Sequence, residues 1–356
     1  MNKYQSDKLR AISFFLILLV IMVHSTNLSV RMDADFTAIN KGLNSFLQNF
    51  ISDGIAKIAS PLFFAISGYL FFLNIKEGKP VEFLGKYKKR FRTLVIPYLL
   101  WSIFGLVLYF VLQSIPTFKP FFTRELIRDY SFSQVLTRIF LQPIPYQLWF
   151  IRDLTVLVLI SPLVYWLLKS FRYLIVLFFL ILWFINFNYV VFDNRSILFF
   201  TFGAYFSVNG IDPHNFKLNY QHIYITICWI ALVFCKTALA HIGCANNTII
   251  LILQRASILL GILAIWFLYD NLLKNIDISS TRIYNLFQYT FFIYAFHEPI
   301  ITIVKKSLYF ILGTTELSSF LIYLLAPTIT LFFSIIVASY LKNISPALYK
   351  IITGKR

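Results

Sequence analysis

Six side chains that can carry a proton or a charge lie within otherwise apolar stretches: His24, Arg152, Asp153, Arg255, His297 and Glu298. A charge in a membrane span costs about 2.5–3.5 kcal/mol on insertion scales, so it needs a partner or a function. Because a neutral imidazole near pH 7 can take a proton from a hydroxyl, His24 and His297 are candidate general bases. Together these groups predict a buried site for acid–base chemistry.

Several of these groups also have a structural interpretation. Arg152 and Asp153 can neutralise each other at a helix end, and Arg255 can belong to a polar seam between helices. His24 can be an interfacial histidine at the end of the first span. We expect instead that Arg152, Arg255 and His297 face an interior cavity, because lipid would penalise them.

A second group of charges is basic and dense: Lys86, Lys88, Lys89, Arg90 and Arg92. Lys86 with Arg90, and Lys88 with Arg92, are i,i+4 pairs that would repel on one helical face unless an anion bridges them. Phosphates are the obvious anion. The alternative is that the cluster only orients the chain in the membrane.

The elements that must position these residues are membrane helices. Hydrophobic residues make up 59% of the 356 residues and charged residues only 13%, against roughly 25% in soluble domains. These figures exclude a soluble globular protein and a disordered chain, and the continuous apolar runs exclude a transmembrane β-barrel. We therefore expect an all-α, polytopic integral membrane protein.

About ten transmembrane helices in one domain, 1–356, are expected from the apolar segments: 11–30, 58–75, 93–118, 146–168, 173–192, 196–211, 218–235, 248–269, 283–304 and 317–341. The formal charge of +17 then falls in the loops and implies no nucleic acid partner. An N-in/C-in topology places 19 Lys and Arg residues inside and 11 outside, as the positive-inside rule favours. The loop 119–145 is then external.

Arg10 precedes His24 on the first predicted span. Fourteen residues place the two about 40° apart around the helix and about 21 Å apart along its axis, so they share a face. Cys228, Cys235 and Cys244 lack paired metal-ligand spacing, and we expect no metal site.

Four segments of the predicted spans occur in order: Ser60-Pro-Leu-Phe-Phe-Ala-Ile-Ser-Gly-Tyr-Leu70, Arg90-Phe-Arg-Thr-Leu-Val-Ile-Pro-Tyr98, Gln147-Leu-Trp-Phe-Ile-Arg-Asp-Leu154 and Phe292-Ile-Tyr-Ala-Phe-His-Glu-Pro299. In these segments the chain resembles the membrane-bound acyltransferase-3 family of bacterial proteins that O-acylate surface glycans. The family has Arg, ten residues and then His on the first span, where this chain has Arg10 and His24 with thirteen between. Lys88 stands where the family has the first Arg of its Arg-x-x-x-Arg motif.

The resemblance implies transfer of an acyl group, most often acetyl, from cytoplasmic acyl-CoA to a hydroxyl of a cell-surface or lipid-linked glycan. The implied catalytic residues are His24, His297 and Arg152, with Trp149, Asp153, Arg255, Tyr294 and Glu298 in the cavity. The resemblance also implies that the donor is bound by Arg10, Lys88, Lys89, Arg90 and Arg92. Acetyl-CoA is then a co-substrate, no cofactor is bound, and the location is the bacterial cytoplasmic (inner) membrane.

A different class of function is also compatible with the pattern. Ten spans with interior charges describe the substrate pathway of a glycan exporter or transporter. Against this reading, the sequence has no inverted repeat and no paired broken helices of the kind that secondary transporters contain.

Overall fold

The computed structural model describes residues 1–28, 42–116, 122, 125–187, 192–216, 221–243, 246–273 and 276–355. Within these ranges the chain consists of helices and their connections, without a strand, which confirms the predicted all-α class. Cys244 and parts of the predicted spans 11–30, 93–118, 173–192 and 218–235 lie outside the described residues, as does part of the loop 119–145.

Six helical stretches of this described part are long and apolar enough to cross a membrane. They are α1 (Lys3–Ser25), Leu43–Phe72 with α2 (Leu43–Gln48) and α3 (Ala59–Phe72), Pro80–Ser114 with α4 (Pro80–Arg90) and α5 (Ile96–Ser114), α11 (Gln221–His241), α12 (Asn247–Leu273) and α14 (Glu316–Ile344). Tyr146–Leu159, which includes α7 (Trp149–Leu159), meets α8 (Ser161–Phe171) at a 64° bend and gives a seventh if the pair is one span. The chain is a multi-pass membrane protein. The total of ten and the N-in/C-in topology stay predictions.

Several helices extend beyond the charge-free segments that predicted them. The helix α1 begins at Lys3, eight residues before the predicted span, and includes Asp7, Lys8 and Arg10. The side chain of Lys8 is fully buried and its Nζ donates to Asp270 Oδ2 at 2.7 Å. A charged side chain that is paired with an opposite charge can therefore lie within a membrane helix. The predicted span began too late because only segments without charged residues were counted as spans.

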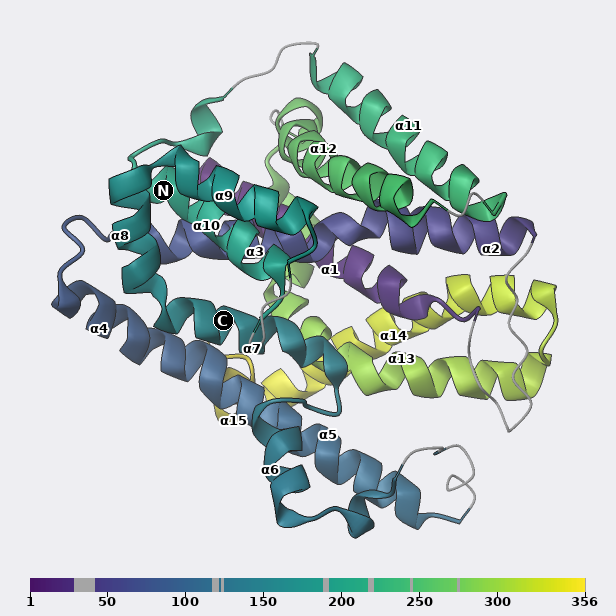
Figure 1. The fold of residues 1–356 in the computed structure, drawn as a ribbon. Helices are drawn as coiled ribbons and strands as arrows, with labels where there is room; N and C mark the ends of the chain where they lie inside the picture. Colours follow the sequence, from purple (N-terminus) through teal and green to yellow (C-terminus); the bar gives the residue numbers. More distant parts are fainter. Residues whose placement is uncertain are drawn as a thin grey trace. The chain divides into compact units, whose positions relative to one another are not determined.

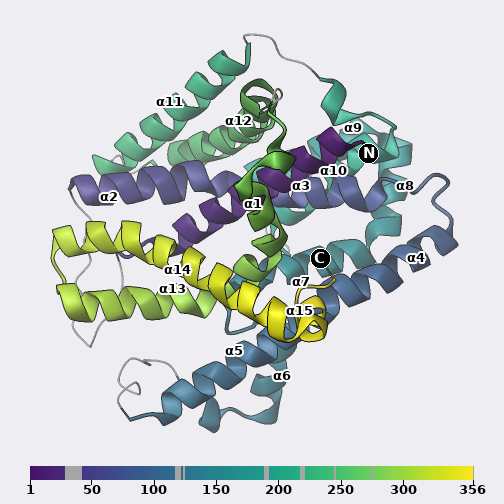
Figure 2. The same cartoon turned by 180° about the vertical axis from the view of Figure 1, so that it is seen from behind.

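The described chain forms two compact units, and each is described by itself. Unit 1 comprises Met1–Val23, Phe46–Lys88 and Asp153–Thr290. It contains most of α1, together with α3, α8, α9 (Tyr173–Phe184), α10 (Asn194–Val208), α11 and α12. In both views α11 runs beside α12, and α3 lies against α10 (Figures 1 and 2).

Two glycines explain the close approach of α3 and α10. A Cβ at Gly68 would lie 2.0 Å from the carbonyl oxygen of Phe200, and one at Gly203 would lie 1.8 Å from the carbonyl oxygen of Ala65. The backbones of the two helices are thus in direct contact, which only residues without a side chain allow.

Unit 2 comprises His24–Ser45, Lys89–Arg152 and Phe291–Arg356. Its helices are α5, α6 (Phe132–Phe140), α13 (Thr290–Leu312), α14 and α15 (Pro346–Ile352). The helices α13 and α14 form an antiparallel hairpin that is visible in both views (Figures 1 and 2). The C-terminal α15 is attached to α5, because Trp101 Nε1 donates to Ile352 O at 3.0 Å.

The start of α5 departs from the α-helical spacing that the sequence analysis assumed. Residues Phe91–Val95 form a π-helical turn between α4 and α5. Pro97 has no N–H, and in an α-helix its ring would clash with the carbonyl four residues earlier, so a wider turn relieves the clash. The predicted pair Lys88 and Arg92 crosses this junction, so α-helical i,i+4 stacking does not describe it.

Candidate functional site

The site in unit 2 begins with a break in helix α13. Glu298 has non-helical angles (φ −102°, ψ 130°), as the residue before a proline commonly does. Pro299 has no N–H, so it cannot donate to the carbonyl of Ala295 four residues earlier. The buried Gln147 Nε2 donates instead to Ala295 O at 3.0 Å and to Glu298 O at 3.1 Å. The break fixes the position of the Glu298 backbone next to the segment that precedes α7.

The side chains of Glu298, Tyr146 and His24 form a hydrogen-bonded chain. Tyr146 Oη donates to Glu298 Oε1 at 3.1 Å, and His24 Nδ1 lies 2.5 Å from the same Oη. When Glu298 is ionised its carboxylate only accepts, and the single hydroxyl proton of Tyr146 is then directed at Glu298. His24 Nδ1 must then donate to the tyrosine oxygen. This tautomer leaves the lone pair on His24 Nε2, which is the form that a general base requires.

His297 lies next to this chain but differs from His24 in exposure. The two imidazole rings have centroids 5.1 Å apart. The ring of His297 is completely buried, and its Nδ1 lies 2.7 Å from Tyr294 O and 3.2 Å from Ile293 O, both on its own helix. His24 is half-buried. A hydroxyl of a large substrate can therefore reach His24 more easily than His297.

Two further residues of α13 complete the site. Thr302 Oγ1 donates to Glu298 Oε2 at 2.9 Å, so each carboxylate oxygen of Glu298 accepts from a hydroxyl. Lys305 Nζ donates to His24 O at 2.7 Å and to Thr26 O at 3.1 Å. A cation at the carbonyls that end α1 satisfies groups that the helix leaves without an internal partner. Lys305 thus holds the backbone that carries His24.

A cavity of about 570 Å³ lies in the same unit. Tyr146, Trp149 and Arg152 are among its lining residues, and the other described lining residues are Tyr109, Gln113, Phe122, Glu125, Ile127, Tyr130, Arg138, Gln142, Pro143 and Ile144. Arg152 donates to Leu141 O at 2.9 Å. Tyr146 therefore lines the cavity, and its hydroxyl bonds to His24 and Glu298.

Six of the eight predicted catalytic and cavity residues belong to unit 2: His24, Trp149, Arg152, Tyr294, His297 and Glu298. The structure brings His24, His297 and Glu298 into one cluster. Tyr294 supports it, because its hydroxyl donates to Gln147 O at 2.5 Å. Their catalytic and binding roles stay predictions.

Asp153 and Arg255 belong to unit 1 and make structural contacts there. The buried Asp153 Oδ2 accepts from Ser196 Oγ at 2.7 Å and from the backbone N–H at residue 193 at 3.0 Å, at the start of α10. Arg255 donates to Phe184 O at 2.8 Å, at the last residue of α9, and to Asn186 Oδ1 at 2.9 Å, just beyond it. These contacts agree with an interior position for Arg255, and a place for either residue in the predicted cavity stays a prediction.

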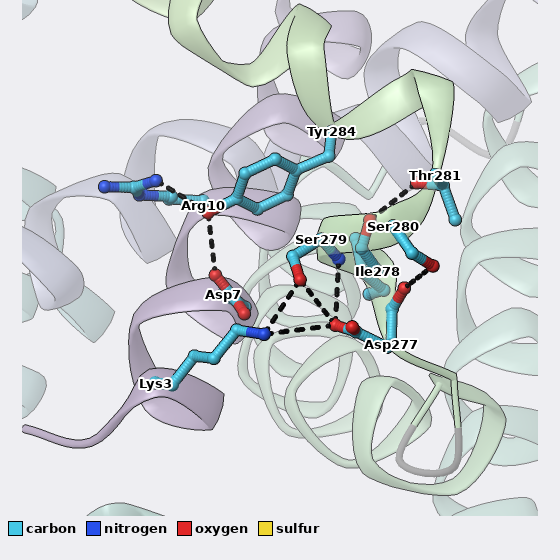
Figure 3. Close-up of polar contacts among 9 residues, drawn as sticks. All are labelled: Lys3, Asp7, Arg10, Asp277, Ile278, Ser279, Ser280, Thr281 and Tyr284. Atoms are coloured by element: carbon cyan, nitrogen blue, oxygen red, sulfur yellow. Dashed lines mark hydrogen bonds and ion pairs between the residues drawn. The ribbon is translucent and has the colours of Figure 1, made fainter.

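Arg10 forms part of a polar cluster at the start of α1 in unit 1 (Figure 3). Its guanidinium donates to Tyr284 Oη at 2.8 Å, and that hydroxyl lies 3.0 Å from Asp7 Oδ1. Lys3 Nζ lies 2.8 Å from Ser279 Oγ and 3.4 Å from Asp277 Oδ1.

Asp277 also accepts from Ser279, and these hydrogen bonds together with the charge of Lys3 hold the pKa of Asp277 below its usual value. The cluster attaches the first turns of α1 to the segment 277–284. Donor binding by Arg10 stays a prediction.

The basic cluster is divided between the units. Lys88 ends a segment of unit 1, whereas Lys89, Arg90 and Arg92 belong to unit 2. Lys88, Lys89 and Arg92 are exposed, as a site for a soluble phosphorylated donor requires. Donor binding by the cluster stays a prediction as well. Among the described residues, no group of three His, Cys, Asp or Glu side chains could hold a metal ion.

The site has four members that were not predicted from the sequence: Tyr146, Gln147, Thr302 and Lys305. Thr302 and Lys305 follow Glu298 at i+4 and i+7, a spacing that places residues on one helical face and could have found them. Gln147 and Tyr146 had no such signal, because their partners are about 150 residues away in the sequence.

Comparisons with known proteins identify the family of the chain. The model of the acyltransferase-3 family, described as "Acyltransferase domain", matches residues 7–339. The chain is also similar to "Succinoglycan biosynthesis protein ExoH" from Rhizobium meliloti (strain 1021), with 25% identity over 329 residues, which cover 89% of this chain and 84% of that protein. No solved structure matches the chain. The chain therefore belongs to the acyltransferase-3 family, in agreement with the resemblance that the four sequence segments carry.

Proposed function

We propose that this acyltransferase moves an acyl group, in the first instance acetyl, from acyl-CoA to a hydroxyl of a glycan, with His24 as the general base. Family membership supports acyl transfer, and the relative named for succinoglycan biosynthesis supports a glycan acceptor. The observation that carries the assignment of the base is the chain from Glu298 through Tyr146 to His24.

The proposed reaction starts with the acceptor hydroxyl at His24 Nε2. The imidazole takes the hydroxyl proton while the oxygen attacks the thioester carbonyl carbon. A C–O bond forms, the C–S bond breaks, and the CoA thiolate leaves and receives the proton from the imidazolium. During proton transfer, the carboxylate of Glu298 stabilises the imidazolium through the hydroxyl of Tyr146.

His297 and Arg152 have supporting roles in this proposal. Because His297 is completely buried beside His24, it positions the ring of the base. Arg152 lies in the cavity wall, where a guanidinium can stabilise the negative charge that develops on the thioester oxygen. The pantetheine arm of the donor would extend inward from the basic cluster to deliver the acyl group. The membrane of residence would be the bacterial cytoplasmic membrane, with the acceptor at or near the cell surface.

Radiolabel transfer tests the proposal directly. Membranes that contain the protein should move label from [¹⁴C]acetyl-CoA to the surface glycan, and His24→Ala should remove this transfer while leaving the amount of protein unchanged. His241→Ala is the matched control, because His241 is an exposed histidine at the end of α11 in unit 1. Glycan export without label transfer would instead identify an exporter. Undiminished transfer by His24→Ala would contradict the assignment of the base.

A further inference from the structure

The cavity of unit 2 has the composition of a ligand site. Its volume of about 570 Å³ falls within the roughly 300–1,000 Å³ of small-molecule pockets. Five of its lining residues are aromatic: Tyr109, Phe122, Tyr130, Tyr146 and Trp149. Five others carry a polar or charged group: Gln113, Glu125, Arg138, Gln142 and Arg152. Aromatic faces with a few fixed hydrogen-bonding groups suit a ring with both apolar C–H and polar hydroxyl faces, as a sugar has.

The walls of this cavity are held by specific contacts. Gln113 Oε1 accepts from Ile127 N at 2.8 Å, which fixes the segment after residue 125 against α5. A capping box between Ser131 and Gln134 starts α6, and Gln134 Nε2 donates to Glu125 Oε2 at 3.0 Å. Ser102 Oγ, on α5, is bonded to the carbonyls of residues 138 and 139 at the end of α6. Hydrogen bonds within the unit therefore hold the walls of the cavity in place.

The charges of the lining favour an anion. Among the described lining residues, two guanidinium groups, Arg138 and Arg152, oppose one carboxylate, that of Glu125. Arg138 lies over the ring of Tyr130 at 5.9 Å and makes a long hydrogen bond of 3.5 Å to Gln142 O. A guanidinium has five N–H donors in a fixed fork that matches a carboxylate or phosphate with two parallel bonds. Arg138 thus has both the position and the geometry to bind an anionic group.

The cavity is also joined to the proposed base. Tyr146 is half-exposed and lines the cavity, and its hydroxyl lies 2.5 Å from His24 Nδ1. A ligand in the cavity therefore contacts the residue that sets the tautomer of His24. The distribution of Lys and Arg predicts that the loop 119–145 is external, which is where a surface glycan is found.

From these observations we infer that the cavity binds a sugar unit of the acceptor glycan that carries an anionic group, with Arg138 as a specificity-determining residue. The inference rests on the proposed function, since it names the class of acceptor for the same site. The sugar ring stacks on the aromatic wall, the anionic group pairs with Arg138, and a ring hydroxyl points toward His24.

Saturation-transfer difference NMR on the full chain in lipid nanodiscs tests binding without any turnover. The probes are methyl β-D-glucoside, methyl β-D-glucuronide and glucose 6-phosphate, which distinguish a neutral sugar, a carboxylate and a phosphate. At least one anionic probe should bind about tenfold more tightly than the neutral one, with saturation at its ring protons. Arg138→Gln should remove this preference, and Arg138→Lys should restore part of it.

The matched control is Arg128→Gln. Arg128 lies in the same segment but is mostly exposed and outside the cavity lining, so its loss should leave probe binding unchanged. The inference is overturned if no probe binds, if the neutral sugar binds as tightly as the anionic ones, or if Arg128→Gln loses as much as Arg138→Gln. Binding of an anionic probe by a protein that transfers no acyl group would contradict the proposed function, whereas the preference of the cavity for an anionic sugar, through Arg138, would still hold.

Discussion

Removal of one oxygen atom, in Tyr146→Phe, tests the chain that orients His24. The phenyl ring keeps its place in the cavity wall, but the bonds of 2.5 Å to His24 and 3.1 Å to Glu298 are lost. A hydrogen bond to a charged group contributes about 1.5–3 kcal/mol. Because about 1.4 kcal/mol is a factor of ten in rate, kcat should fall about ten- to a hundredfold. His24 itself remains, so the loss should be smaller than that of His24→Ala.

The assay is the rate of acetyl transfer at saturating donor and acceptor, with both KM values measured. Tyr165→Phe is the matched control, because it removes a tyrosine hydroxyl bonded to a backbone carbonyl, Lys76 O at 3.1 Å, in unit 1. Since Tyr146 and Glu298 act through one chain, the double variant Tyr146→Phe/Glu298→Gln should lose little more than the worse single variant. A folded Tyr146→Phe with wild-type kcat, or fully additive losses in the double variant, would refute the reasoning.

Three further variants test other parts of the structure. Lys305→Met removes two hydrogen bonds to the end of α1 and should lower kcat about tenfold or more with the donor KM unchanged. Lys305→Arg should recover part of the rate, and an unaffected kcat in Lys305→Met would contradict this role. Gly203→Ala forces a methyl group into the α3 backbone and should lower the melting temperature of the purified protein by several degrees, whereas Gly85→Ala, with open space around it, should not. Lys88→Ala/Arg92→Ala should raise the acyl-CoA KM and its sensitivity to salt more than the acceptor KM, and an unchanged donor KM would count against the donor site.

The sequence predicted the class of fold well because membrane helices have a strong local signal. The predicted segments 248–269 and 317–341 correspond closely to α12 and α14, since twenty or more apolar residues in a row have few other structures. The start of α1 was predicted too late because the charged Lys8 was placed outside the span. Lys8 is buried in the helix because it forms an ion pair with Asp270, which lies more than 250 residues away in the sequence. Local composition cannot anticipate such a pairing.

The candidate site was predictable where spacing along one helix was sufficient. His297 and Glu298 drew attention as polar groups in an apolar run, and the i+4 and i+7 positions of Thr302 and Lys305 contained usable information. The part that sequence reasoning could not supply is tertiary. Gln147 replaces the hydrogen bond that Pro299 removes, and Tyr146 joins Glu298 to His24, because the segment before α7 lies against the break in α13.

The assignment of the base is tested most directly by the two histidine variants measured side by side. His24→Ala should lower the turnover of folded protein by about 10²–10⁴ while the binding of acyl-CoA is nearly unchanged, since a positioned general base contributes that factor. His297→Ala should retain more of the rate, because the buried ring of His297 positions the base and does not meet the substrate. If His297→Ala abolishes transfer while folded His24→Ala keeps more than about a tenth of the wild-type rate, far above what loss of a general base leaves, then His24 is not the base.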